Sequence, residues 1–133
     1  MKVGEKAIRS NTLTLDHVKT YTEITGDYNP LHFYEGFAGK TKFKELVVQV
    51  GLTSGIQNPL VATDMPGLGT VFMSHDLKLI ALVFIGDTIT AEAEVLEVHA
   101  SKPVTRLTMT ITRQTRETVL EGEAWCYPFT PED

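Results

Sequence analysis

The sequence predicts an α+β fold in which an antiparallel sheet is covered on one face by a long helix. In the first half of the chain, apolar residues recur at helical spacing, whereas four later segments alternate apolar and polar residues. Consecutive strands joined by short turns pair antiparallel, and their shared apolar face must be covered. With 133 residues, 42% of them apolar, the chain is expected to form a single domain over residues 1–133.

The first predicted element is a helix that ends just before Asp27. Thr14 is a suitable N-cap, because its hydroxyl can accept a hydrogen bond from a first-turn N–H. Gly26 can take the left-handed conformation that ends a helix, so we expect helix from Thr14 through Thr25. The apolar residues of this segment recur at helical spacing: Leu15, Val18, Tyr21 and Ile24.

A second, shorter helical stretch is predicted soon afterwards. Asn29 is a good cap and Pro30 suits a first helical turn, so we expect helical structure around residues 31–38. The segment between Asp27 and His32 is then a tight, rigid link between two helices.

The cover of the sheet is expected to be a central helix over residues 48–63. This segment is too rich in glycine to be stable alone, but it is apolar enough to be stabilised by burial on most sides. Pro59 marks the point at which such a helix would break. Residues 64–69 contain Pro66-Gly67 and are predicted to form a loop.

Four strands are predicted after this loop, over residues 71–79, 89–95, 106–112 and 120–126. The parity of the second strand breaks at Val95-Leu96, which indicates a β-bulge. In the first strand the residues expected to share the packed face are Val71, Met73, His75, Leu77 and Leu79.

The composition excludes several kinds of partner. A formal net charge of −5 argues against a nucleic-acid-binding protein, which needs a basic face to neutralise phosphates. Cys126 is the only cysteine, so no internal disulfide is available. Residues 1–6 lack the apolar core of a secretory signal, and the long uncharged stretch 46–63 contains too many polar residues for a membrane span. We therefore expect a cytoplasmic protein with no membrane partner.

Asp27 and His32 are the candidate acid–base pair. They are separated by a rigid turn and can therefore converge on one small volume. Addition of water to a double bond needs two proton transfers, one from the attacking water and one to Cα, and a carboxylate and an imidazole that share a water can perform both. A single Asp and His at this spacing more often belong to a helix-linking turn, so the surrounding string decides between the two interpretations.

That string resembles the hydratase-2 motif of the MaoC-like (R)-specific enoyl-CoA hydratases. The resemblance is carried by Tyr-Thr-Glu-Ile-Thr-Gly-Asp-Tyr-Asn-Pro-Leu-His at residues 21–32, by Phe37-Ala38, by Met65-Pro66-Gly67 and by residues 83–88. It implies a hot-dog fold, in which an antiparallel sheet wraps around a long central helix, and a homodimer whose sheets join edge to edge. It also implies that Asp27 and His32 are the catalytic pair.

The chain departs from this family at the start of the central helix. Close members have His-Gly there, and the glycine amide binds the thioester carbonyl, whereas this sequence has Gln49-Val50 followed by Gly51. A backbone N–H at a helix N-terminus can stabilise an enolate whatever its side chain, so the amides of Val50 and Gly51 are both candidates. Gln49 and Asn58, which stands where bacterial members often have serine, are expected to shape the site together with Asn29.

We therefore expect reversible hydration of a trans-2-enoyl thioester to the (R)-3-hydroxyacyl thioester. Coenzyme A or the phosphopantetheine of an acyl carrier protein would be part of the substrate, and no metal or redox cofactor is expected. Two alternatives remain open, a hot-dog acyl-CoA thioesterase and a non-catalytic acyl-CoA-binding protein. The sequence does not decide which of Asp27 and His32 activates the water, nor the acyl chain that is bound.

Overall fold

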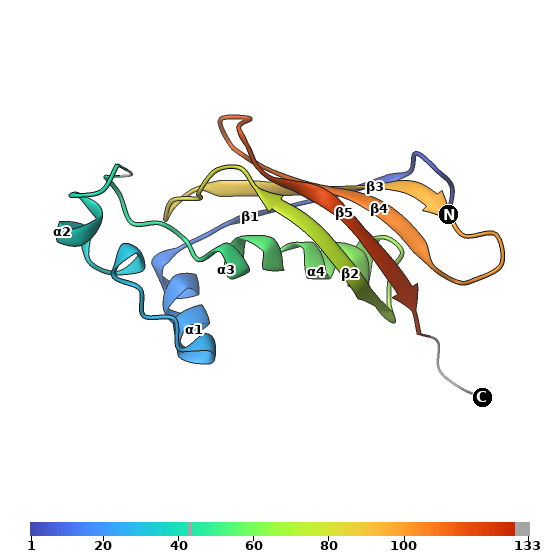
Figure 1. Cartoon of the computed structure of the whole chain (residues 1–133), viewed down its shortest axis with the longest axis horizontal. Helices are drawn as coiled ribbons and strands as arrows, with labels where there is room; N and C mark the ends of the chain where they lie inside the picture. The colour runs from blue at the N-terminus through green and yellow to red at the C-terminus, as the bar shows by residue number, and fades with distance from the viewer. Residues whose placement is uncertain (43, 130–133) are drawn as a thin grey trace.

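In a computed structural model, which describes residues 1–42 and 44–129, one antiparallel sheet lies over a central helix (Figure 1). The sheet has five strands in the order β1-β3-β4-β5-β2. The α+β class and the helix-covered sheet are thus confirmed. The strands are β1 (Lys6–Thr12), β2 (Thr70–Leu79), β3 (Thr88–Val98), β4 (Thr105–Arg113) and β5 (Thr118–Pro128). The helical elements are α1 (Leu15–Thr25), η1 (Pro30–His32), α2 (Glu35–Ala38), α3 (Val50–Gly55), α4 (Gln57–Pro59) and η2 (Leu60–Asp64).

The prediction of four strands was wrong by one, because β1 forms an edge of the sheet and was not recognised. β1 pairs antiparallel with β3, with Lys6 opposite Glu94 and Thr12 opposite Thr88. Its sequence shows no alternation of apolar and polar residues, since Ile8 is 62% exposed and most of the strand is polar. An edge strand that buries so little has no period that sequence reasoning can detect.

The central helix comprises α3, α4 and η2 and spans residues 50–64, two residues later at its start than predicted. Pro59 does not break it but is followed by a π-helical turn over Leu60–Asp64. Proline has no N–H, so the carbonyl of Gly55 loses its ordinary helical donor. The side-chain amide of Asn58 donates to that carbonyl instead, at 3.1 Å, and the helix continues.

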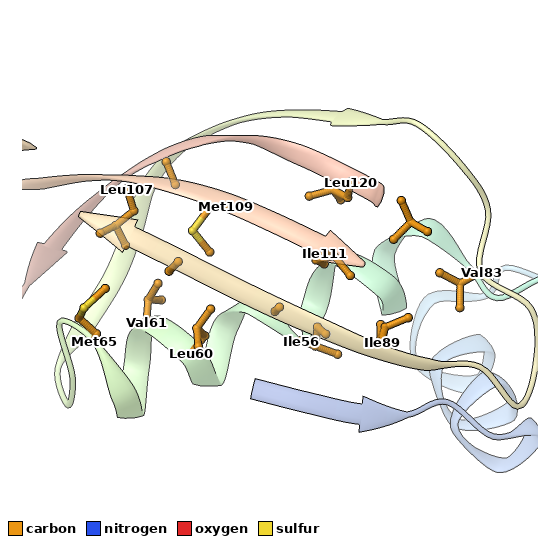
Figure 2. Close-up of a cluster of buried hydrophobic side chains, with 14 of the residues drawn as sticks. Ile56, Leu60, Val61, Met65, Val83, Ile89, Leu107, Met109, Ile111 and Leu120 are labelled. Carbon is orange, nitrogen blue, oxygen red and sulfur yellow. The ribbon is translucent and has the colours of Figure 1, made fainter. Parts of the chain in front are cut away.

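The apolar core lies between the central helix and strands β3 to β5 (Figure 2). Leu60 and Val61 of the helix and Leu107, Met109 and Ile111 of β4 are each at most 1% exposed. Full burial of one such side chain contributes roughly 1.5–3 kcal/mol, so this layer supplies most of the driving force for folding. The predicted alternation of β3, β4 and β5 and the bulge after Val95 are confirmed.

Strand β2 differs from its predicted pattern in its first half. A register shift between Phe72 and Ser74 reverses the parity, so that Phe72 pairs with Cys126 and faces the core. The expectation that Val71 and Met73 face the core was wrong, because they are 46% and 59% exposed.

Candidate active site

Asp27 follows directly on the C-terminal end of α1. As predicted, the Thr14 hydroxyl caps the helix, accepting from the His17 N–H, and Gly26 ends it in the left-handed conformation with φ of 78°. The Gly26 N–H donates to the Thr22 carbonyl at 2.7 Å, which closes the last turn. The chain therefore leaves α1 in a defined direction with Asp27 as its first residue.

Three polar contacts hold Asp27. The Thr22 hydroxyl donates to its backbone carbonyl at 2.9 Å, and its own N–H donates to the Thr25 hydroxyl at 3.3 Å. The Asn29 N–H donates to the carboxylate Oδ1 at 3.2 Å. One carboxylate oxygen is thus anchored to the backbone, and the other, Oδ2, is directed toward His32.

His32 is the last residue of the 3₁₀ turn η1, which the Asn29 side chain opens by accepting from the Leu31 N–H at 3.0 Å. The His32 Nδ1 lies 2.6 Å from the Val47 carbonyl. A carbonyl can only accept, so Nδ1 carries a proton and the neutral ring has its lone pair on Nε2. Nε2 lies 3.6 Å from Asp27 Oδ2.

This distance leaves the pair open to a third group. It exceeds the 2.7–3.2 Å usual for a direct N–H···O bond, so one water molecule can donate a hydrogen bond to each atom. The two side chains also differ in exposure, at 8% for His32 and 43% for Asp27. A buried, backbone-fixed imidazole and a solvent-accessible carboxylate therefore face the same small volume.

That volume is a cavity of about 300 Å³ between the Asp27–His32 loop and the start of α3. The Gln49 side chain makes no capping hydrogen bond at the start of this helix. The first-turn amides of Val50 and Gly51 consequently keep their donors for a ligand. The residues of the two walls include Asp27, Asn29, His32, Gln49, Val50 and Gly51.

Gln49 is buried and directed away from the helix end. Its Nε2 donates to the Val18 carbonyl at 3.1 Å and to the Thr22 hydroxyl at 2.9 Å. Because Thr22 in turn donates to Asp27, a chain of hydrogen bonds joins α3, α1 and the carboxylate loop. Sequence reasoning missed Thr22 and the Val47 carbonyl as supports of the pair. Thr22 stands in the string that carried the resemblance, whereas Val47 gave no signal, since its contact with His32 spans 15 residues.

Asn58 lies outside this cavity. It is exposed, it satisfies the Gly55 carbonyl, and it lines a separate cavity of about 450 Å³ with Val61, Phe72 and His75. Within one chain the structure therefore does not bring Asn58 to the Asp27–His32 pair.

A buried ion pair outside the cavity supports the position of His32 indirectly. Arg113 binds Asp87 through Nε at 2.8 Å and Nη2 at 3.2 Å, while the Phe84 N–H and the Gln114 side chain donate to the same carboxylate. Burial acts to raise the pKa of Asp87, but these hydrogen bonds outweigh it and hold the pKa below its ordinary value. The pair fixes the turn whose Phe84 bridges to Val47, the residue that binds His32.

Residues 1–42 and 44–129 contain neither a cluster of metal ligands nor a membrane-spanning helix. No group of three or more His, Cys, Asp or Glu side chains there is arranged to hold a metal ion. No helix of these residues is long and apolar enough to cross a bilayer.

Comparison with known proteins places this geometry in context. Residues 2–119 match the family described as "MaoC like domain". The (R)-specific enoyl-CoA hydratase of Aeromonas caviae is 32% identical over 124 residues, which are 93% of this chain and 92% of the relative. The 3-hydroxybutyryl-CoA dehydratase of Methylorubrum extorquens is 35% identical over 93% of this chain and 78% of its own length.

Solved structures show the same fold. The (R)-hydratase from Aeromonas caviae superposes with a TM-score of 0.94 at 31% identity, covering 97% of this chain and 98% of that one. An R-hydratase from Pseudomonas aeruginosa, in its unliganded form, superposes with a TM-score of 0.90 at 29% identity, covering 100% of this chain and 84% of its own. The hot-dog fold is therefore confirmed.

Proposed function

The chain belongs to the MaoC-like family of hydratases and dehydratases, and we propose that Asp27 and His32 are the acid–base pair with which it hydrates an enoyl-CoA. The observation that carries this proposal is the open 3.6 Å approach of Asp27 Oδ2 to His32 Nε2, in a cavity that also contains the uncapped start of α3. The product would be the (R)-3-hydroxyacyl thioester, as the names of the relatives indicate.

The two acceptor atoms would orient the attacking water. One hydrogen of the water points to Oδ2 and the other to Nε2, so a lone pair of the oxygen is free to attack Cβ. As the C–O bond forms, one acceptor takes a proton from the water, and this same proton is delivered to Cα, directly or by way of the other side chain, which completes the addition. The balance is one water consumed per double bond, with both side chains returned to their starting state.

The thioester carbonyl would lie at the start of α3. Attack at Cβ moves negative charge to that oxygen, and a preorganised N–H there stabilises the charge. Val50 and Gly51 are the candidate donors, because the helix start carries no side-chain cap. The Val50 side chain is 44% exposed at this point and narrows the approach of the acyl group.

The proposed reaction needs no metal or redox cofactor. Coenzyme A or the phosphopantetheine of an acyl carrier protein would enter as part of the substrate. Hydration and dehydration share one transition state, so the same groups serve both directions.

We also propose a homodimer joined along β2. This strand is an edge of the sheet, and an unpaired edge is a template for pairing with another chain. Apolar side chains are exposed on it and beside it, with Leu68 at 88%, Met73 at 59% and Val71 at 46%. Light scattering of the purified chain should give twice the mass of 14.7 kDa, and Met73→Lys should shift it toward the monomer.

The fate of crotonyl-CoA tests the proposed reaction. Loss of the enoyl absorbance together with formation of (R)-3-hydroxybutyryl-CoA is the expected result, and Asp27→Asn should lose it. Release of free thiol without a hydroxyacyl product would overturn the proposal in favour of a thioesterase. Tight binding without any product would instead identify an acyl-CoA-binding protein.

A further inference from the structure

Gly51 and Tyr21 fit together at the start of the central helix. A Cβ added to Gly51 would overlap the Tyr21 hydroxyl and would lie 2.7 Å from the ring carbon Cζ that carries it. The tyrosine therefore extends from α1 across the first turn of α3, and its hydroxyl occupies the space that a side chain at position 51 would need. Glycine is required here by this close approach.

The hydroxyl is placed at the end of the helix where the free amides point. In an α-helix each Cα–Cβ bond tilts toward the N-terminus. A group at the Cβ position of Gly51 therefore lies on the N-terminal side, where the first-turn N–H groups of Val50 and Gly51 are directed. Tyr21 and Gly51 both line the cavity of Asp27 and His32.

Tyr21 and Gly51 also line a neighbouring cavity. It has a volume of about 540 Å³, and its other residues include Arg9, Asn11 and His17. These two residues are the only ones common to the two cavities as described. The tyrosine thus lies at the boundary between the cavity of the proposed reaction and a second, more polar cavity.

The Tyr21 hydroxyl has a donor to offer. Among the described residues no hydrogen bond joins it to another protein atom, and Tyr21 is only partly buried. Only the backbone carbonyl of Tyr21 accepts a hydrogen bond from a side chain of the described residues, that of the Thr25 hydroxyl at 2.8 Å. A phenol that contacts the helix start and lacks a partner is free to donate to a ligand there.

We infer that the Tyr21 hydroxyl donates a hydrogen bond to the thioester carbonyl oxygen of the bound acyl group, beside an amide of α3. This inference rests on the proposed hydratase function and adds a side-chain donor to it. The neighbouring residues Val50 and Gly51 support this inference. The Val50 side chain narrows the space for a ligand at the helix start, whereas Gly51, which has no side chain, leaves room for the Tyr21 phenol. The phenol keeps its proton throughout and stabilises the charge that develops on the oxygen.

Tyr21→Phe on the full chain tests the inference by kinetics. Removal of one oxyanion donor typically lowers kcat by 10²–10³, and because an amide remains we expect a loss of about ten- to a hundred-fold with KM changed only a few-fold. Tyr34→Phe is the matched control, because Tyr34 is 64% exposed and lies outside the cavity. Parental kcat in a folded Tyr21→Phe variant would overturn the inference.

A double-mutant cycle separates the hydroxyl from general damage. Gly51→Ala should lower kcat in the parent by displacing the hydroxyl. It should have a smaller effect when Tyr21→Phe has already removed that hydroxyl, because the new Cβ then meets only the ring, with its shortest contact at Cζ. Additive losses would contradict the close contact between the Tyr21 hydroxyl and the Cβ position of residue 51.

A spectroscopic measurement tests the role of Tyr21 independently of whether the protein hydrates its substrate. An aromatic enoyl-CoA such as cinnamoyl-CoA should show a red-shifted absorption when it binds Asp27→Asn, because a polarised carbonyl draws charge along the conjugated chain. Adding Tyr21→Phe should reduce this shift at equal occupancy. An unchanged shift would overturn the role of Tyr21 even if hydration is confirmed, whereas a parent that binds but never hydrates would count against the reaction alone.

Discussion

Two pairs in this molecule join an aspartate to a basic side chain but differ in their geometry. Asp87 and Arg113 meet at 2.8 Å with side-chain exposures of 8% and 16%, and backbone and glutamine donors complete the shell of the carboxylate. Asp27 and His32 approach only to 3.6 Å, and the carboxylate is 43% exposed. The first pair is closed, and the second leaves one oxygen and one nitrogen free.

The difference separates stabilisation from chemistry. A carboxylate whose oxygens are all occupied has no lone pair for a substrate water, whereas Asp27 Oδ2 has one. The closed pair nevertheless contributes to the open one, because the turn at Asp87 carries Phe84, which bridges to Val47, and the Val47 carbonyl binds His32. Substitutions in the two pairs should therefore have different consequences, one for folding and the other for rate.

The largest expected effect is on rate, in the open pair. Asp27→Asn keeps an acceptor for the Asn29 N–H but removes the charge, and His32→Ala removes the imidazole. Each should lower the hydration rate by about 10² to 10⁴, the range usual for one acid–base group, and the unfolding midpoint of Asp27→Asn should stay near that of the parent. Glu121→Gln, at an exposed carboxylate on the interior strand β5, is the matched control. Near-parental rates in either folded variant would contradict the assignment of the pair.

The closed pair should show the reverse behaviour. Asp87→Asn leaves the Arg113 guanidinium largely buried without its counter-charge, and we expect a loss of roughly 3 kcal/mol in the free energy of unfolding. Urea unfolding of the two proteins measures this difference. A loss below that of the exposed control Glu121→Gln would mean that the pair is not a structural support.

The pH dependence of that loss follows from the pKa of Asp87. Because the pKa is lower in the folded protein than its ordinary value of 3.8, the charged form contributes stability above that value and loses it as the pH falls through the folded pKa. The difference between parent and Asp87→Asn should be constant from about pH 5 to 8 and should shrink below about pH 4. A difference that persists unchanged in acid would contradict this assignment.

Sequence reasoning worked where the decisive interactions are local. Thr14 and Gly26 delimit α1 through contacts within one turn, and the link from Asp27 to His32 is short, so its geometry is nearly set by its own residues. The strands β3 to β5 were also recognised, because each has one wet face and one buried face.

The remaining features depend on contacts between distant segments. The bond from His32 to Val47 and those from Gln49 to α1 join residues that no periodicity relates. The parity of β2 is reversed by a bulge at Met73, a residue that an alternating pattern assigns to the core. Asn58 corresponds to a site position by alignment, yet in one chain it satisfies a helix carbonyl beside Pro59.

A smaller effect is expected on the free energy of unfolding when the buried side-chain amide of Gln57 is replaced. Gln57 is 1% exposed, and among the described residues neither of its amide atoms has a hydrogen-bond partner. Gln57→Met should raise the free energy of unfolding by about 1–2 kcal/mol, because an unpaired buried amide is replaced by an apolar chain of similar shape. The same change at Gln49 breaks two hydrogen bonds and should be destabilising. A loss of stability in Gln57→Met would show that water satisfies the amide.

The smallest expected effect is at Thr22, which connects the buried Gln49 side chain to the loop of the open pair. Its hydroxyl accepts from Gln49 and donates to the Asp27 carbonyl, both at 2.9 Å, so it is a positioning residue that fixes the carboxylate loop without contacting the substrate. Thr22→Val preserves the shape of the side chain and removes these two hydrogen bonds, each of which contributes about 1 kcal/mol. If about 1 kcal/mol of the free energy that orients Asp27 is lost, kcat should fall roughly five-fold. Thr20→Val, exposed on the same helix, should change neither kcat nor KM. Lower stability with parental kcat would assign Thr22 to the fold alone, whereas a fall in kcat with KM unchanged would show that the open pair needs this bond for its reactivity.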